Sequence, residues 1–388
     1  MSEAADLQAA RKRATHRRAA GVASDFDPSR LALGRRLAGL QRTWIARAVG
    51  VTPAAITQYE KGQIKPTLPV VEAMCEVLGV PPDFFRAGYP VQALPASSAH
   101  FRSLRSTSSL EREKALAFAE LTLVVLEAVE RYVELPAIRL PDLDVSPNLD
   151  LEEVVQLAQQ ARARMGLGSG PVPHMVRLLE AHGVAVVRLD DATRRVDAFS
   201  HQSGSRPLVL LNPLKGDKAR SRFDAAHELG HLLMHHDTEP GSRLIEDQAH
   251  AFAAEFLAPA AQIGPELPAR LDWSVLHTLK RRWGVSLRAL VVRTYKLGRF
   301  GDTTYQRAMR QLSSWGLPEP GPLGPPEAPV LIPRAVALLD GSNIVQWLTK
   351  ETGLPADIVI RVLDAAGSQD ERPPVNFGDF PSSSHTTA

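Results

Sequence analysis

The pentapeptide His227-Glu228-Leu229-Gly230-His231 predicts a helix that carries a metal site. A spacing of four residues places His227 and His231 one turn apart on the same helix face. Both imidazoles can then bind one Zn²⁺, at about 2.0–2.1 Å from each nitrogen. Glu228 lies beside the open coordination position, where its carboxylate can take a proton from water and pass it to a leaving amine. The motif is therefore typical of a zinc hydrolase.

The helix around this motif is expected over Arg220–His236. An alternative interpretation is a surface helix that carries two incidental histidines. The apolar residues on both sides of the motif argue against that alternative, because they predict a buried helix. We interpret His235 and His236 as polar residues at the end of the helix, where the macrodipole favours them.

A second helix, expected over Arg243–Leu257, offers a third zinc ligand. The candidates on it are Glu246, Asp247, His250 and Glu255. Glu246 and His250 share one helix face, whereas Glu255 points about half-way round the helix from Glu246. Small residues beside Glu246 would let the two helices approach closely, so we predict Glu246 as the ligand. His250 is then either a partner of the zinc ligands or a contact to the substrate oxyanion.

The segments Arg222–Leu233 and Glu246–Pro259 resemble the two signatures of the ImmA/IrrE metallopeptidases. The resemblance extends over about residues 170–300 and includes Gly284-Val285-Ser286. It implies that the first Glu of the second signature, Glu246, completes the zinc site. It also implies an endopeptidase that cleaves a DNA-binding repressor. The family usually has Asn or Asp at the position of His250.

Short helices around a tight turn are expected near the N-terminus. Leu31–Leu40 has the apolar spacing of one helix, and a second short helix leads to a turn at Gly50-Val51. Thr52 is suited to be the N-cap of the next helix, with Pro53 at its first position. That helix continues through Glu60. Two short helices joined by a tight turn predict a helix-turn-helix, whose second helix can enter the major groove of DNA.

The string from Val49 to Gly62, with Lys65-Pro66-Thr67 and Leu78-Gly79-Val80 after it, resembles the lambda-repressor-like (XRE-type) DNA-binding domain. The resemblance covers about residues 28–88. It implies that base edges of an operator are contacted by Thr52, Ala54, Thr57 and Gln58, of which Gln suits adenine. It also implies phosphate contacts from Arg42, Lys61 and Lys65. The family commonly has Gln at the position of Arg42. The alternative is a small helical module that binds protein.

The charge distribution favours a double-stranded DNA partner for the N-terminal part. Residues 1–65 contain 12 Lys and Arg against 5 Asp and Glu, whereas the rest contains 33 against 38. A basic start on an acidic body predicts contact with a polyanion. Arg outnumbers Lys by 36 to 9, which is typical of proteins from GC-rich bacterial genomes.

Several classes of protein are excluded by what the sequence lacks. The single cysteine, Cys75, excludes a disulfide framework and any Cys-based zinc site. No apolar run approaches the roughly 18 residues that a membrane helix needs. No apolar run follows the basic N-terminus as it would in a secretory signal. We therefore expect a cytoplasmic protein without a membrane partner.

The predicted organisation follows from these motifs. We expect a basic disordered arm over 1–27, a helix-turn-helix domain over 28–88, a helical linker over 89–165, a zinc-peptidase domain over 166–302, a helical segment over 303–366 and a disordered tail over 367–388. The long linker helix would either pair with its copy in a homodimer or pack within the chain.

Few strands are expected. Val184–Leu189 and Pro207–Leu211 have the composition of strands, whereas Leu94–Ser109 is expected as a Ser-rich connector. The predicted fold class is mostly α. It consists of an all-α helix-turn-helix domain, an α+β zincin-like domain with a small sheet, a helical linker and a helical C-terminal segment.

Two functions fit these features. In the first, a transcriptional regulator carries a zinc-dependent endopeptidase domain that cleaves a repressor or the chain itself in response to a signal. Glu228 favours this function, because a structural zinc site has no use for a general base. In the second, the zinc domain is a sensor or interaction module without proteolysis. The fusion favours that alternative, because a peptidase acting on a separate repressor needs no DNA-binding domain of its own.

Overall fold

The structure is a computed structural model that describes most of the 388-residue chain. The described residues are 16, 18–95, 99–101, 108–146, 148–189, 196, 198–202, 206–212, 217–235, 242–339 and 343–367. Most of the expected N-terminal arm and all but the first residue of the expected C-terminal tail therefore lie outside the described residues. Among the described residues, no helix is both long enough and apolar enough to cross a lipid bilayer.

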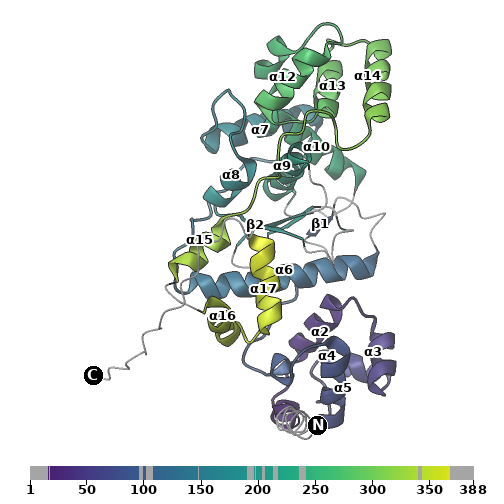
Figure 1. Cartoon of the computed structure of the whole chain (residues 1–388), viewed down its shortest axis with the longest axis vertical. Coiled ribbons are helices and arrows are strands. Elements are labelled where there is room, and N and C mark those ends of the chain that lie inside the picture. The colour runs from purple at the N-terminus through teal and green to yellow at the C-terminus, as the bar shows by residue number, and fades with distance from the viewer. Residues whose placement is uncertain are drawn as a thin grey trace, which may run out of the picture.

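The helix-turn-helix region lies at the lower end of the molecule in Figure 1. Its elements are α2 (Pro28–Leu37), α3 (Arg42–Val49), α4 (Pro53–Glu60), α5 (Leu68–Leu78) and the 3₁₀ turn η1 (Pro82–Phe85). Gly50 ends α3 with φ 74°, a left-handed conformation that glycine adopts without steric cost. The Thr52 hydroxyl accepts a hydrogen bond from the Ala55 N–H at 3.1 Å and caps α4.

The expected arm needs correction in its second half. Residues 18–24 are helical, and within them Ala19 and Val22 are completely buried. These two side chains belong to the same hydrophobic core as α2 to α5. An amphipathic turn that buries apolar side chains is stabilised by packing. This part of the chain is therefore an additional helix of the N-terminal domain.

A four-stranded mixed sheet lies in the middle of the molecule. Its strands are β1 (Ala99–Phe101), β2 (Ala185–Arg188), β3 (Phe199–His201) and β4 (Leu208–Leu211), in the spatial order β1-β3-β4-β2. β2 is parallel to β4, and the other two pairs are antiparallel. The predictions placed β2 and β4 correctly but did not include β3, and they treated the segment with β1 as a connector.

The two faces of the sheet belong to two different hydrophobic cores. Val187 and Leu210 face the core shared with the helix-turn-helix region, whereas Val186 and Val209 face the core around the histidine motif. This alternation follows from the period of two along a strand. We call the first the DNA-side core and the second the metal-side core. Because both faces are buried, the strands read as continuous apolar runs.

The long helix α6 (Ser109–Glu130) crosses the molecule between the helix-turn-helix region and the sheet (Figure 1). Most of its residues from Ala115 to Val129 are buried within the DNA-side core. The Arg36 guanidinium of α2 forms an ion pair with the Glu120 carboxylate of α6, with nitrogen–oxygen distances of 2.5 and 2.7 Å. Of the two arrangements expected for this helix, the structure shows packing within the chain, so α6 is a core element rather than a linker.

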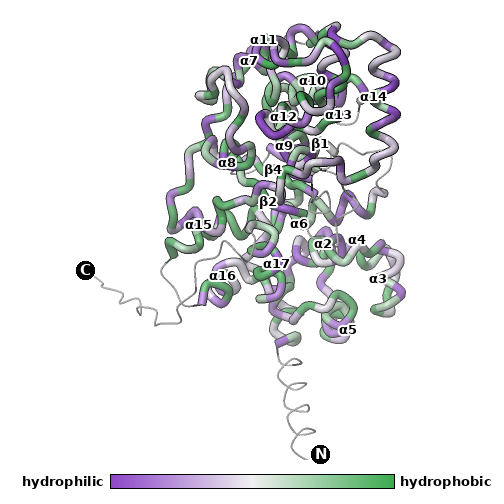
Figure 2. The backbone as a smooth tube through the Cα atoms, turned by 45° about the horizontal axis from the view of Figure 1, so that its top comes forward, coloured by the Kyte–Doolittle hydropathy of each residue, from purple (hydrophilic) through white to green (hydrophobic). Residues whose placement is uncertain are grey.

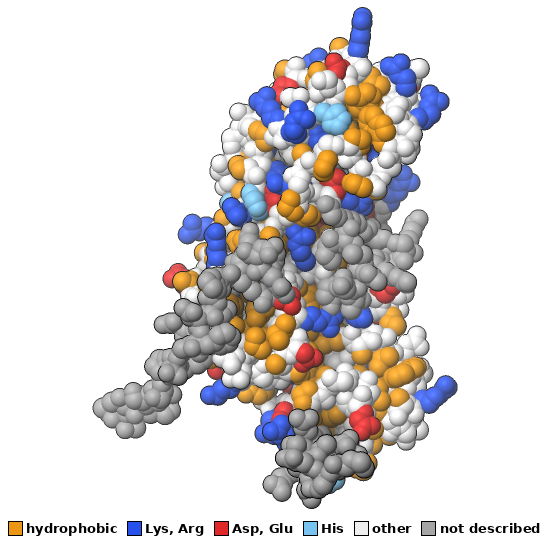
Figure 3. All heavy atoms as spheres, viewed as in Figure 1, with side chains coloured by type: hydrophobic (Ala, Val, Ile, Leu, Met, Phe, Trp, Pro, Cys, Tyr) orange, Lys and Arg blue, Asp and Glu red, His pale blue; other side chains and the backbone are white. Residues whose placement is uncertain are grey.

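The metal-side core is formed mainly by helices at the upper end of Figure 1. These are α7 (Leu151–Arg164), α8 (Met175–Ala181), α9 (Lys218–Met234), α10 (Arg243–Leu257), α11 (Ala260–Ile263) with the 3₁₀ turn η4 (Gly264–Glu266), α12 (Trp273–Trp283), α13 (Leu287–Lys296) and α14 (Asp302–Trp315). Lys and Arg side chains are prominent on this end of the face shown in Figure 3. Asp150 caps α7 in a capping box with Glu153, as its position before an apolar-periodic run predicts.

The C-terminal helices are divided between the two cores. α14 packs in the metal-side core, whereas α15 (Leu331–Leu338), α16 (Ile344–Thr352) and α17 (Ala356–Ala366) pack in the DNA-side core. Figure 2 shows α5 and α17 as largely hydrophobic segments, in agreement with their burial in that core. The expected single segment over 303–366 is therefore two structural parts, joined by the Pro- and Gly-rich loop after α14.

Candidate metal centre

Two adjacent helices position the candidate ligands. α9 begins after Asp217, whose carboxylate accepts the Arg220 N–H at 3.1 Å, and it carries the histidine motif. α10 begins after Ser242, whose hydroxyl accepts the Ile245 N–H at 3.2 Å. Gly230 allows the two helices to approach closely, because a Cβ there would lie 3.1 Å from the Phe252 ring of α10.

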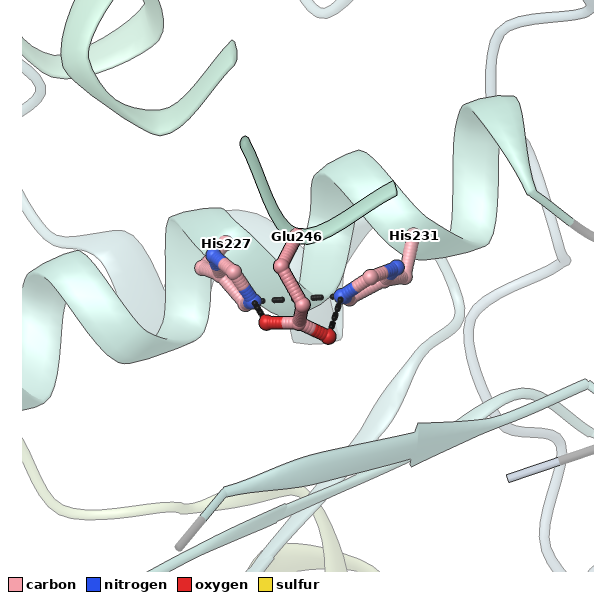
Figure 4. A group of neighbouring side chains, drawn as sticks. All are labelled: His227, His231 and Glu246. Carbon is pink, nitrogen blue, oxygen red and sulfur yellow. Dashed lines mark hydrogen bonds and ion pairs between the residues drawn. The ribbon is translucent and has the colours of Figure 1, made fainter. Parts of the chain in front are cut away.

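His227, His231 and Glu246 form a compact group in which the side chains point toward one another (Figure 4). The Nε2 atoms of His227 and His231 lie 3.1 Å apart. Glu246 Oε2 lies 3.3 Å from His227 Nε2, and Glu246 Oε1 lies 3.6 Å from His231 Nε2. Both histidines are completely buried, and Glu246 is partly buried.

This spacing fits a tetrahedral zinc ion. Ligand atoms at about 2.0–2.1 Å from zinc in a tetrahedral site lie about 3.3 Å from one another. The three separations in this structure, 3.1, 3.3 and 3.6 Å, lie around that value. Within the described part of the chain, the buried Glu246 Oε2 has no hydrogen-bond donor, so a cation is the missing partner that fits it best. Two imidazoles and one carboxylate are also the donor set of many catalytic zinc sites.

The charge state of Glu246 follows from its surroundings. Burial acts to raise the pKa of its carboxyl group, but the adjacent His227 and His231 imidazoles lower it, and their effect is larger. The pKa of Glu246 is therefore well below its ordinary value. The group is a carboxylate, the form that binds a metal ion.

Glu228 lies on the same helix beside these ligands and is completely buried. The Ser200 hydroxyl of β3 donates a hydrogen bond to Glu228 Oε2 at 2.8 Å. This contact fixes the orientation of the carboxylate and connects the sheet to α9. Sequence reasoning did not find Ser200, because it lies on a three-residue strand without a recognisable pattern.

His235 is part of a buried hydrogen-bonded chain, and its interpretation as an incidental polar residue was wrong. Its Nε2 lies 3.0 Å from Gln248 Oε1, and its Nδ1 lies 3.0 Å from His231 Nδ1. The Gln248 amide nitrogen donates to the Leu149 carbonyl at 2.6 Å. His236, which the prediction treated with His235, lies outside the described residues.

The hydrogen bonds from Leu149 to His231 indicate which ring nitrogens of His235 and His231 carry a proton. A carbonyl can only accept, so the Gln248 nitrogen faces Leu149 and its oxygen faces His235. His235 Nε2 then carries the proton, and in the neutral ring His235 Nδ1 accepts one from His231 Nδ1. In this arrangement His231 Nε2 would offer its lone pair to a metal ion held beside Glu246, which is the tautomer that a ligand requires.

The other candidates on α10 have different surroundings. His250 Nδ1 donates to the Glu246 carbonyl at 2.6 Å, and its ring lies 4.6 Å from the ring of His227, edge to face. Because this Nδ1–H is used within the helix, an oxyanion contact would need a cationic ring, so the geometry favours a packing partner of His227. Glu255 is buried and paired with Arg293, away from the ligands, as its helix position predicts.

The residues expected to contact DNA lie on α4 or in the residues that flank it, except Arg42, which is the first residue of α3. Thr52, Ala54, Gln58, Lys61 and Lys65 are exposed, and Thr57 is half-buried. Lys65 Nζ donates to the Ser24 carbonyl at 2.5 Å. The half-exposed Arg42 donates to the buried Glu60 carboxylate at 2.6 Å, and Arg35 pairs with the same carboxylate. Arg42 therefore has a structural partner that the prediction did not include.

Comparison with known families finds two matches, one for each of the two functional parts of the chain. Residues 179–295 match the peptidase family model of the IrrE N-terminal-like domain. Residues 4–86 match a helix-turn-helix domain model. The chain joins a helix-turn-helix domain to an IrrE-like domain. The curated proteins contain no significant match to the chain.

The IrrE-like match runs from α8 to α13 and thus includes both helices of the metal centre. The helix-turn-helix match begins before residue 28, in agreement with the additional helix over residues 18–24. The helix-turn-helix domain suggests DNA binding. The predicted fold class, mostly α with a small sheet, is confirmed.

Proposed function

We propose that this protein is a DNA-binding transcriptional regulator whose IrrE-like domain is a zinc-dependent endopeptidase. The observation that carries the proposal is the separation of the three ligand atoms of His227, His231 and Glu246, which fits one tetrahedral ion beside a buried Glu228. The match to a peptidase family supports it. The regulator acts where its operator is, in the cytoplasm of a bacterial cell.

Each residue of the candidate site would have a separate role in peptide hydrolysis. His227, His231 and Glu246 would hold Zn²⁺, which supplies a Lewis acid for the scissile carbonyl and lowers the pKa of its water to about 7. Glu228 would accept a proton from the attacking water and deliver it to the leaving amine. Ser200 holds the Glu228 carboxylate in position through Oε2. His235 would hold the His231 ring in the tautomer that binds a metal ion through Nε2.

A second function is favoured by one observation. The helix-turn-helix domain shares a continuous core with α6 and one face of the sheet, and the Arg36–Glu120 pair connects them. Such packing can transmit a change at the metal centre to the DNA-binding helix without proteolysis. In this alternative the IrrE-like domain is a sensor or interaction module.

One experiment separates these functions. The purified protein and its Glu228→Gln variant are compared for zinc content and for cleavage of two probes: the protein itself and helix-turn-helix repressors encoded near its gene. The exposed Glu152→Gln variant is the matched control. One zinc per chain, with cleavage that only Glu228→Gln abolishes, is expected for the endopeptidase. Zinc without cleavage would favour the sensor module, and a chain that binds no zinc would overturn the metal centre.

A further inference from the structure

The strand β1 belongs to the segment that joins the helix-turn-helix domain to α6, yet it forms one edge of the sheet. It pairs antiparallel with β3, with Ala99 opposite His201, His100 opposite Ser200 and Phe101 opposite Phe199. β4 is on the other side of β3. If β1 left, β3 would present its own unpaired backbone N–H and C=O groups, which are a template for another extended chain.

This edge is adjacent to the candidate catalytic carboxylate. Ser200 in the middle of β3 donates to Glu228 Oε2 at 2.8 Å, and β3 packs against α9. Neighbouring strands lie about 4.8 Å apart. A chain paired with β3 therefore lies one strand spacing from the residue that orients Glu228. In Figure 4 strands of the sheet run past the group formed by His227, His231 and Glu246.

We propose that the edge of β3 is the docking site for an extended peptide and that β1 occupies this site as an internal competitor. Recognition would use mainly the peptide backbone, which adds as a strand, with side chains on one face pointing toward α9. The proposal deepens the proposed function, because the docked peptide is its substrate class. The competition itself requires neither zinc nor catalysis.

The competition has a predictable strength. A strand tethered by a short linker acts at an effective concentration of about millimolar. A peptide added at micromolar concentration is therefore excluded while β1 is paired. Any event that withdraws β1, such as a change in the connected helix-turn-helix domain, would open the edge of β3.

The test removes the backbone pairing of β1 in the Glu228→Gln background, so that binding is measured without cleavage. Successive N–H groups of a strand point to opposite edges, so one of two adjacent residues must donate to β3. The Ala99→Pro/His100→Pro variant removes that donor. The Ala99→Val/His100→Val variant keeps both N–H groups and is the matched control. The probe is a fluorescent peptide with the sequence of residues 95–105, and a scrambled peptide of the same composition controls for nonspecific binding.

We expect hydrogen exchange at the amides of 199–201 to be faster in the proline variant, and the probe to slow it again. The probe should bind the proline variant at least about 10-fold more tightly than the valine variant. Equal binding to both variants, or unchanged exchange at β3, would overturn the proposal.

A final measurement distinguishes failure of the docking edge from failure of the proposed endopeptidase function. Glu228 is restored in the proline variant, and the protein is loaded with zinc. Cleavage of the bound probe supports both. A probe that binds the β3 edge but stays intact contradicts the endopeptidase and leaves the docking edge standing. Zinc-dependent self-cleavage without binding of the probe contradicts the docking edge alone.

Discussion

The Nδ1 atoms of His231 and His235 lie 3.0 Å apart in the interior of the protein, and the hydrogen bonds of Gln248 assign the role of donor to His231. The Gln248 amide sets this direction, because its nitrogen donates to the Leu149 carbonyl and its oxygen is left to accept from His235. His235 is thus a positioning residue for a candidate ligand, one helical turn beyond the motif. Such partners fix the tautomer and ring orientation of a metal-bound histidine.

We therefore predict that His235→Ala weakens zinc binding by about 10- to 100-fold, the range typical for loss of a ligand's hydrogen-bond partner. Competition with a chelator of known affinity measures the effect directly. Gln248→Met, which breaks the chain one step further from His231, should weaken binding less. His277→Ala on α12 is the control, since it leaves the centre intact. Unchanged affinity in His235→Ala would contradict the assigned role.

Glu180 predicts a stability that depends on pH. Burial raises the pKa of its carboxyl group from 4.5 to about 7, against the lowering effect of hydrogen bonds from the N–H groups of Leu331 and Val330. The folded protein thus binds this proton more tightly than the unfolded chain. Its stabilising effect is complete below pH 4.5 and is lost as the pH rises to about 7.

The expected loss is at most about 3.5 kcal/mol, because the pKa rises from 4.5 to about 7 and each pKa unit corresponds to about 1.4 kcal/mol. Urea unfolding at about pH 5 and about pH 8 measures it. Glu180→Gln keeps an acceptor for both N–H groups but cannot ionise, so its stability should fall less between the two pH values. Glu152→Gln, on the exposed face of α7, should behave as the unmodified protein does. If the free energy of unfolding of Glu180→Gln changes between the two pH values as much as that of this control, Glu180 does not titrate as expected.

The ion pair of Arg36 and Glu120 predicts a large cost for a single truncation. Glu120 is completely buried and also accepts the Leu94 N–H at 2.8 Å. Glu120→Ala leaves a guanidinium without its charge partner, so we expect a destabilisation of about 3–5 kcal/mol in denaturant unfolding. The Arg36→Met/Glu120→Met double variant should cost less. The half-exposed Asp83, which pairs with Arg86, is the comparison, and Asp83→Ala should cost at most about 1 kcal/mol.

The helix-turn-helix domain predicts two different effects on DNA binding. On a site selected from random DNA, Gln58→Ala should relax base preference at one position by about 1–3 kcal/mol. Lys61→Ala should weaken binding to all sequences and reduce the salt slope by about 1. Gel-shift titrations at several salt concentrations measure both. Arg42→Ala should also lower stability, because Arg42 pairs with the buried Glu60. Identical effects from Gln58→Ala and Lys61→Ala would contradict the assigned contacts.

Local sequence patterns predicted the helices well. Asp150 before an apolar-periodic run gave the start of α7, and Thr52 gave the start of α4, because a cap acts within its own first turn. The strand β3 was missed because three residues are too few for a pattern, and its pairing with β1 and β4 is with segments elsewhere in the chain. Helix periodicity likewise could not show that α6 would be a central core element.

For the candidate site, the sequence by itself determined the residue types and their order on each helix. His227 and His231 share a face because 3.6 residues make a turn, and this holds in any α-helix. The tertiary structure decided the rest: which carboxylate meets those imidazoles, that Ser200 orients Glu228, and that His235 bonds to a glutamine 13 residues away. It also placed Arg30 of α2 against the Thr352 carbonyl, 322 residues along the chain. Periodicity and capping act within a few residues, whereas these contacts exist only after distant elements pack together and exclude water.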